Sequence, residues 1–336
     1  VGPIRSVGPI RLITDPIEKG RVLSLFRSQY GERQFARWYD HPARILRLDT
    51  DGSGTVGAPA AAYYDWLTAE FDNVADDYDR HISGNRINRL LRDRSLAQLR
   101  RAFAGARCLI EIGCGSGMET LPLLREGHEV LCVDISPRML ETVRAKARTD
   151  GLTERLRTRL LRAAELDTLR RELGSAQFDG AYSTYGALNC EEDLTPVPPA
   201  LHALLRPDGR FVAGVYNRWC LFEVVGYALS GQPGRAFGRT HRPVPVGSSR
   251  FCVDIFAHST SDFRRLFDRW FRADRVEAIP AILPPSDLVG YAEKFARHFD
   301  RLARWDRAVG ARWPLRELGD HFLMTFRRRE LPATPS

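Results

Sequence analysis

Three glycines at alternate positions follow one apolar run, and an acidic residue ends the next. Gly113, Gly115 and Gly117 come directly after the run 109–112. Because these residues lack a Cβ, the chain can turn sharply there, and a ligand can lie against main-chain N–H groups at the start of a helix. Asp134 ends the second run, where a carboxylate can accept hydrogen bonds from both hydroxyls of a ribose. The pattern predicts a nucleotide-sized pocket in a β-α-β unit.

The spacing of the glycines separates two classes of nucleotide site. The dinucleotide fingerprint G-x-G-x-x-G needs a glycine at position 118, where this chain has Met118. The spacing G-x-G-x-G, preceded by Glu111 and followed by Asp134, resembles the first motif of the class I S-adenosylmethionine-dependent methyltransferases. A nucleotide site of another kind and a glycine turn without a ligand remain as alternatives.

The resemblance implies S-adenosylmethionine as the cofactor and S-adenosylhomocysteine as the product. In the family, the glycine loop approaches the methionine and ribose portions, and the residue at the position of Glu111 orients the loop or the methionine amine. The segment 162–166 is similar to the one that lies along the adenine ring. The cofactor-binding residues implied in this way are Tyr78, Glu111, Gly113, Cys114, Gly115, Gly117, Asp134, Ile135, Met139, Ala164, Glu165 and Ser183.

Further along the chain the resemblance continues in the expected order. Residues 178–183 are similar to the fourth strand of the family, and 206–215 to its turn and fifth strand. Together the matches run from Tyr63 to Val215. The Asn/Asp-Pro-Pro-Tyr/Phe motif of N6-adenine and glutamine methyltransferases does not follow the fourth strand, which counts against modification of DNA bases.

The expected fold is α/β, with a doubly wound, mostly parallel sheet of seven strands. Rossmann-like packing of this kind has helices on both faces of the sheet. We also expect a helix over 16–47. The predicted parts are an N-terminal tail and helical extension at 1–60, a cofactor-binding core at 61–215, a substrate-cover insertion with helices at 216–310, and the last core strand with a tail at 311–336.

Candidate acceptor-binding residues follow the fourth and fifth strands, because ligands bind at the carboxyl edge of such sheets. Tyr185 and Asn189 follow the fourth strand, and Tyr216 and Arg218 follow the fifth. If the acceptor must lose a proton, a base is needed. His241 is our first candidate for that base, with Tyr185 as a polar positioning group. His321 and His258 rank below it.

The segment 71–79 precedes the core, and two interpretations of it stay open. In similar methyltransferases the Tyr-Asp end of this helix folds over the cofactor as part of a lid. It is equally compatible with an ordinary amphipathic helix whose Tyr78 belongs to the core.

The amino-acid composition limits the kinds of partner that the protein is expected to bind. Hydrophobic residues make up 43% and charged residues 27% of the 336, the net charge is +8, and the basic residues are 47 Arg and 3 Lys. Six cysteines without a C-x-x-C pair indicate a reduced compartment and no metal site. We expect a cytoplasmic monomer or homodimer that binds a small molecule, without a membrane or nucleic-acid partner. The basic residues of 216–260 would suit an acidic acceptor. An RNA methyltransferase and a non-catalytic scaffold are the alternatives.

Overall fold

The computed structural model describes residues 10–12, 46–48, 59–231, 233–248, 251–288 and 296–331. The chain divides into two compact units, Val1–Glu70 with Val246–Val253 and Phe71–Pro245 with Asp254–Ser336. The candidate site lies in the second.

In the first unit, β1 (Ile10–Leu12) and β2 (Leu46–Leu48) form an antiparallel pair. The helix predicted over 16–47 is wrong at its end, since residues 46 and 47 lie in β2. Ladder hydrogen bonds to the other strand hold these residues extended. The rest of that predicted helix lies outside the described residues.

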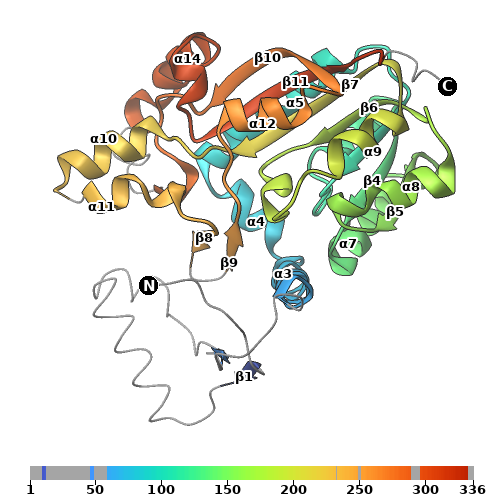
Figure 1. Cartoon of the computed structure of the whole chain (residues 1–336), viewed down its shortest axis with the longest axis horizontal. Helices are drawn as coiled ribbons and strands as arrows, with labels where there is room; N and C mark the ends of the chain where they lie inside the picture. The colour runs from blue at the N-terminus through green and yellow to red at the C-terminus, as the bar shows by residue number, and fades with distance from the viewer. Residues whose placement is uncertain are drawn as a thin grey trace. The chain divides into compact units, whose positions relative to one another are not determined.

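A seven-stranded sheet is the centre of the second unit (Figure 1). In chain order its strands are β3 (Cys108–Ile112), β4 (Glu129–Asp134), β5 (Leu156–Leu160), β6 (Phe178–Ser183), β7 (Leu205–Tyr216), β10 (Phe271–Ile279) and β11 (His321–Arg328). They lie side by side in the order β10-β11-β7-β6-β3-β4-β5. The five strands from β3 to β7 are parallel, and β11 and β10 continue the sheet antiparallel. The predicted doubly wound fold is confirmed.

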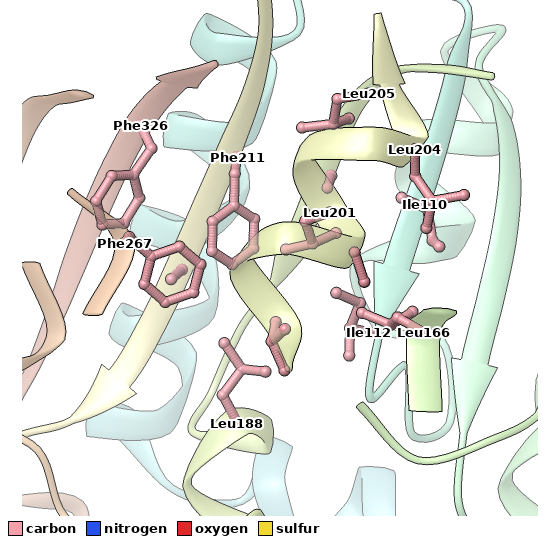
Figure 2. Close-up of a cluster of buried hydrophobic side chains, with 14 of the residues drawn as sticks. Ile110, Ile112, Leu166, Leu188, Leu201, Leu204, Leu205, Phe211, Phe267 and Phe326 are labelled. Carbon is pink, nitrogen blue, oxygen red and sulfur yellow. The ribbon is translucent and has the colours of Figure 1, made fainter. Parts of the chain in front are cut away.

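Helices cover both faces of this sheet, because each face carries a stripe of apolar side chains. On one face pack α8 (Leu166–Leu173), α9 (Val197–Leu204) and α12 (Thr260–Phe267). Figure 2 shows how Leu201 and Leu204 of α9 fill the space between Phe211 and the strand residue Ile110. On the other face pack α5 (Arg86–Ala102), α6 (Thr120–Arg125) and α7 (Pro137–Thr149).

The remaining elements precede the sheet or connect its last strands. They are α3 (Pro59–Val74), α4 (Tyr78–Ser83), α10 (Leu221–Leu229), α11 (Pro233–Ala236), α14 (Phe299–Val309), and the hairpin strands β8 (Val244–Ser248) and β9 (Phe251–Ile255). Among the described helices, none has the length and apolar character needed to cross a lipid bilayer.

The chain after β7 contributes more to the core than its predicted role as a cover. Strand β10 lies within the range 216–310, yet it pairs with β11 along its whole length. Because β10 pairs with β11, strand β11 lies between β7 and β10. The strand of the sheet that comes last in the chain is therefore an interior strand and not an edge strand.

Candidate active site

The three glycines form the turn between β3 and α6. All three have positive φ, at +74° for Gly113, +50° for Gly115 and +83° for Gly117. A Cβ at Gly113 would overlap Ala187, and one at Gly117 would overlap Val143. At Gly115 the nearest atom to a Cβ would be a ring carbon of Tyr78, 3.8 Å away. Gly113 and Gly117 are therefore required by close packing against neighbouring residues, whereas the space beside Gly115 is open.

Asp134 ends β4 and holds the glycine loop. Its Oδ2 accepts the N–H of Gly115 at 2.8 Å, and its Oδ1 accepts the N–H of Ser136 at 2.9 Å. Burial raises the pKa of Asp134 to about 6, although these N–H groups act in the opposite direction. Each carboxylate oxygen has a second acceptor site for a ligand hydroxyl.

Glu111 lies behind the loop rather than in it. Its carboxyl group bonds the hydroxyls of Thr120 and, at 2.9 Å, Tyr182. Burial, with the charge of Glu119 as the next cause, raises the pKa of Glu111 to about 8. The residue is therefore a neutral acid at pH 7 and orients the start of α6 through Thr120.

The segment 71–79 is tied to both loops. Asp72 accepts a hydrogen bond from the Ser136 hydroxyl at 2.5 Å, beside the start of α7. Asp79 bonds the hydroxyl of Ser116 and the ammonium of Lys146, and Lys146 also reaches the Ser116 carbonyl at 2.9 Å. These contacts support the lid interpretation of this segment.

Other predicted cofactor residues lie around the same loops. Met139 is fully buried and Cys114 is 5% exposed, while Ile135 follows Asp134 directly. Ala164 donates its N–H to Glu191 at 3.3 Å, and Glu165 accepts the N–H of Arg162 at 3.0 Å. Their contacts with a cofactor, like those of Tyr78 and Ser183, stay predictions.

A second group of polar and aromatic side chains lies at the ends of β6, β7 and β10 and the start of β11. We call this the acceptor half of the edge, and the loops after β3 and β4 the cofactor half. Tyr185 has a φ of +56°, which is strained for a tyrosine. The guanidinium of Arg92 lies 4.1 Å from its ring centroid, and Arg92 pairs with Glu119 beside the glycine loop. Tyr185 is thus held where the two halves meet.

His321, which the sequence analysis ranked below His241, lies beside Tyr185 and Tyr216. Its ring stacks on Tyr185, with centroids 5.9 Å apart, and meets Tyr216 edge-on at 5.2 Å. Its Nδ1 lies 3.1 Å from Oδ2 of Asp320. In the sequence, the acidic residue Asp320 directly before His321 was the one sign of a possible His-Asp pair. The pairing of β11 with β7 places His321 at the carboxyl edge of the sheet, and this pairing is not evident from the sequence.

Arg239 neutralises the acid beside His321. Its guanidinium is 2.6 Å from Oδ1 of Asp320 and 2.5 Å from Glu223 of α10. Burial raises the pKa of Asp320, but His321 and Arg239 lower it more, to a net value of about 2. Cys220, Glu223 and Asp320 together have the spacing of metal ligands. Since Arg239 bonds both carboxylates, the cluster is a buried ion-pair network.

The structure does not gather all the predicted acceptor residues around one space. The amide of Asn189, which is fully buried, bonds three main-chain groups, of Tyr216 twice and of Phe256 once. Arg218 pairs with Asp262 at 2.9 Å, at the start of α12. These two side chains position the chain, and any acceptor contact by them stays a prediction.

The other two histidines differ sharply in environment. His241, our first candidate base, is exposed on the turn that follows Gly238–Thr240. His258 is buried, and burial together with Arg242 and Arg218 lowers its pKa to about 4. Neither is described in contact with Tyr185, whereas His321 is.

Comparison with known families matches residues 110–213 to a methyltransferase domain. The chain belongs to the class I S-adenosylmethionine-dependent methyltransferases. It is thus a methyltransferase enzyme with S-adenosylmethionine as its cofactor. The matched range contains both cofactor loops and three complete strands, β4 to β6.

Two relatives are named ubiquinone biosynthesis O-methyltransferases. The protein of Methylocella silvestris is 28% identical over 199 residues, which cover 57% of this chain and 72% of the relative. The mitochondrial protein of Schizosaccharomyces pombe is 24% identical over 204 residues, covering 57% and 68%. The structure of the CcbJ methyltransferase from Streptomyces caelestis has the same fold, with a TM-score of 0.51 and 17% identity over 78% of this chain and 99% of that one.

The residues of the cofactor half fit S-adenosylmethionine. The absence of a side chain at Gly115 leaves room for a ligand beside the loop. The carboxylate oxygens of Asp134 can still accept hydrogen bonds from the two hydroxyls of a ribose. Oε1 of Glu119 is buried and has no hydrogen-bond partner among the described residues, so an acceptor is available beside the glycine loop. Arg92 and Glu119 also line a cavity of about 190 Å³ between α4, α5 and the glycine loop.

Proposed function

We propose that this methyltransferase transfers a methyl group to an oxygen of a small-molecule acceptor bound at the acceptor half. The observation that carries the proposal is the division of the carboxyl edge. The glycine loop and Asp134 lie in the cofactor half, and Tyr185 and His321 lie in the acceptor half. Both relatives described above are O-methyltransferases, which supports oxygen as the atom methylated.

S-adenosylmethionine supplies an electrophilic methyl group, so the protein mainly has to align the acceptor and exclude water. Asp134 and the loop around Gly115 would hold the cofactor. Arg92 and Tyr185 would place the acceptor, since they lie between the glycine loop and His321. A planar or anionic acceptor suits an aromatic ring with a guanidinium beside it.

No observation favours RNA as the acceptor. On the described surface, exposed arginines such as Arg100, Arg107 and Arg125 pair with neighbouring carboxylates, of Glu126, Glu129 and Asp150. A surface that tracks phosphates would leave such cations available.

Calorimetric titration with S-adenosylmethionine and S-adenosylhomocysteine tests the first half of the proposal. We expect Asp134→Ala to weaken binding roughly 10- to 100-fold, because charge-assisted hydrogen bonds are lost. The control is Asp150→Ala, which removes an exposed acid at the opposite end of α7. The absence of binding by the wild type would refute the proposal. Formation of S-adenosylhomocysteine with a panel of hydroxyl, thiol and amine acceptors tests the second half.

A further inference from the structure

We propose that His321, oriented by Asp320, is the general base that removes the proton of a hydroxyl acceptor. The inference rests on the proposed function and names the group that performs its proton transfer. It also narrows the acceptor to a phenol or alcohol that is not ionised before it binds. A thioether acceptor has no such proton to lose.

The first argument is position. His321 begins β11 and pairs with Tyr216, the last residue of β7, and with Ile279, the last of β10. It therefore lies at the same edge as the cofactor loops. A Cβ on Gly186 would be 3.8 Å from Nε2 of His321, and the next residue, Ala187, packs against Gly113 of the glycine loop. Two consecutive residues thus separate the histidine from the cofactor half.

The second argument is the tautomer. Asp320 is ionised, since its pKa is about 2, and a carboxylate only accepts hydrogen bonds. Nδ1 of His321 must then donate at 3.1 Å, and in the neutral ring Nε2 carries the lone pair. Nε2 has no hydrogen-bond partner among the residues that the structure describes, and the histidine is 6% exposed. The basic nitrogen is free and aimed away from Asp320.

The third argument is rigidity. Arg239, 4% exposed, bonds the carboxylate of Asp320 at 2.6 Å and its carbonyl at 2.9 Å. It also bonds Glu223 through two nitrogens. With Asp320 fixed in this way, the imidazole is held between Tyr185 and Tyr216 without a change of rotamer on reaction. Such preorganisation is what a base requires.

The charges around His321 come from every element packed against it. They are Asp320 directly before its strand, Arg239 after α11, Glu223 on α10, Arg92 on α5, and the phenols Tyr185 and Tyr216 at the ends of β6 and β7. Asp320 stabilises the imidazolium that forms, and Glu223 offsets the charge of Arg239.

The step balances without another reactant. The acceptor oxygen forms its bond to the methyl carbon as the bond from that carbon to sulfur breaks with its electron pair. The acceptor proton passes to Nε2 of His321, and bulk water later takes it. The products are a methyl ether and a neutral thioether.

Acceptor acidity provides a test that a purely structural role would not pass. Catechol and 4-nitrocatechol are the probes, because the second ionises far more readily. We expect His321→Gln to lower kcat for catechol by about 100- to 10,000-fold and to remove the acid limb of its pH profile. The loss for 4-nitrocatechol should be at least tenfold smaller. A variant that keeps kcat within threefold, or loses both probes equally, would overturn the proposal.

A second measurement decides the matter even if neither probe is methylated. Nitrogen NMR of the full chain with labelled histidine, assigned with His321→Gln, reports the tautomer directly. Protonation at Nδ1 supports the proposal, and protonation at Nε2 refutes it. His128→Gln, directly before β4 at the opposite edge of the sheet, is the control and should leave kcat unchanged. Calorimetry keeps the two failures apart. If the wild type does not bind S-adenosylhomocysteine, the proposed function is refuted, whereas retained binding in His321→Gln shows that the cofactor half is intact and that any defect lies on the acceptor side.

Discussion

Two buried carboxyl groups, one in each half of the edge, have pKa values displaced in opposite directions. Glu111 in the cofactor half bonds two hydroxyls, and burial raises its pKa to about 8. Asp320 in the acceptor half is equally buried, but His321 and Arg239 hold its pKa at about 2. Burial alone neutralises an acid, and adjacent cations reverse the effect. Glu111, behind the glycine loop, is therefore a neutral hydrogen-bonding group, whereas Asp320 in the acceptor half is a fixed charge.

The largest effect should come from breaking the ion pairs that support the acceptor half. Arg94 of α5 is 5% exposed and bonds Glu277 of β10 and, at 2.5 Å, Asp306 of α14. We expect Arg94→Leu to lower the free energy of unfolding by about 3–5 kcal/mol, because the buried carboxylate of Asp306 loses its cation and Glu277 keeps only its pair with Arg275. Urea unfolding measures this.

Arg100 on the same helix is the matched control, since its pair with Glu126 is exposed. Arg100→Leu should change stability little. Equal losses in the two variants would show that burial does not distinguish these pairs, and would weaken the contrast between the halves.

An intermediate effect should appear in the pH dependence of stability. The folded-state pKa of Glu111, about 8, lies above its ordinary value of 4.5. Its contribution to stability is complete below pH 4.5 and is lost as the pH rises through 8, with a slope approaching about 1.4 kcal/mol per unit between these values. Glu111→Gln should remove that slope. Urea unfolding of the wild type and of Glu111→Gln from pH 5 to 8 tests this prediction. If the free energy of unfolding depends on pH in the same way in both proteins, Glu111 is not a neutral acid.

The smallest effect concerns Ser183 at the end of β6. The hydroxyl is buried without a hydrogen-bond partner among the described residues. We expect Ser183→Ala to raise the free energy of unfolding by up to about 1 kcal/mol, since an unsatisfied hydroxyl costs desolvation. Thermal unfolding measures the gain. A decrease would show that the hydroxyl has a partner, and a parallel loss of S-adenosylhomocysteine affinity would place it in cofactor binding.

The fold of the cofactor loops could be predicted from the sequence because their residues are local in the chain. Gly113 to Gly117, Asp134 and the Ser136-Pro137 start of α7 act through backbone geometry within some 25 residues, and Ser136 caps that helix. The acceptor half joins α5, the end of β6, the turn after α11 and the start of β11. Only strand order brings these together, so composition and spacing could not show that His321 lies beside Tyr185.

The position of β11 connects the assembly of the sheet with the proposed proton transfer. This strand is the last of the described strands in chain order, yet it inserts between β7 and β10. Its first residue is the histidine proposed as the base. A molecule in which this segment has not yet inserted therefore has an open sheet and no proton acceptor at the acceptor half, even with its cofactor loops formed. Competence for methyl transfer would then require β11 to be paired in the sheet.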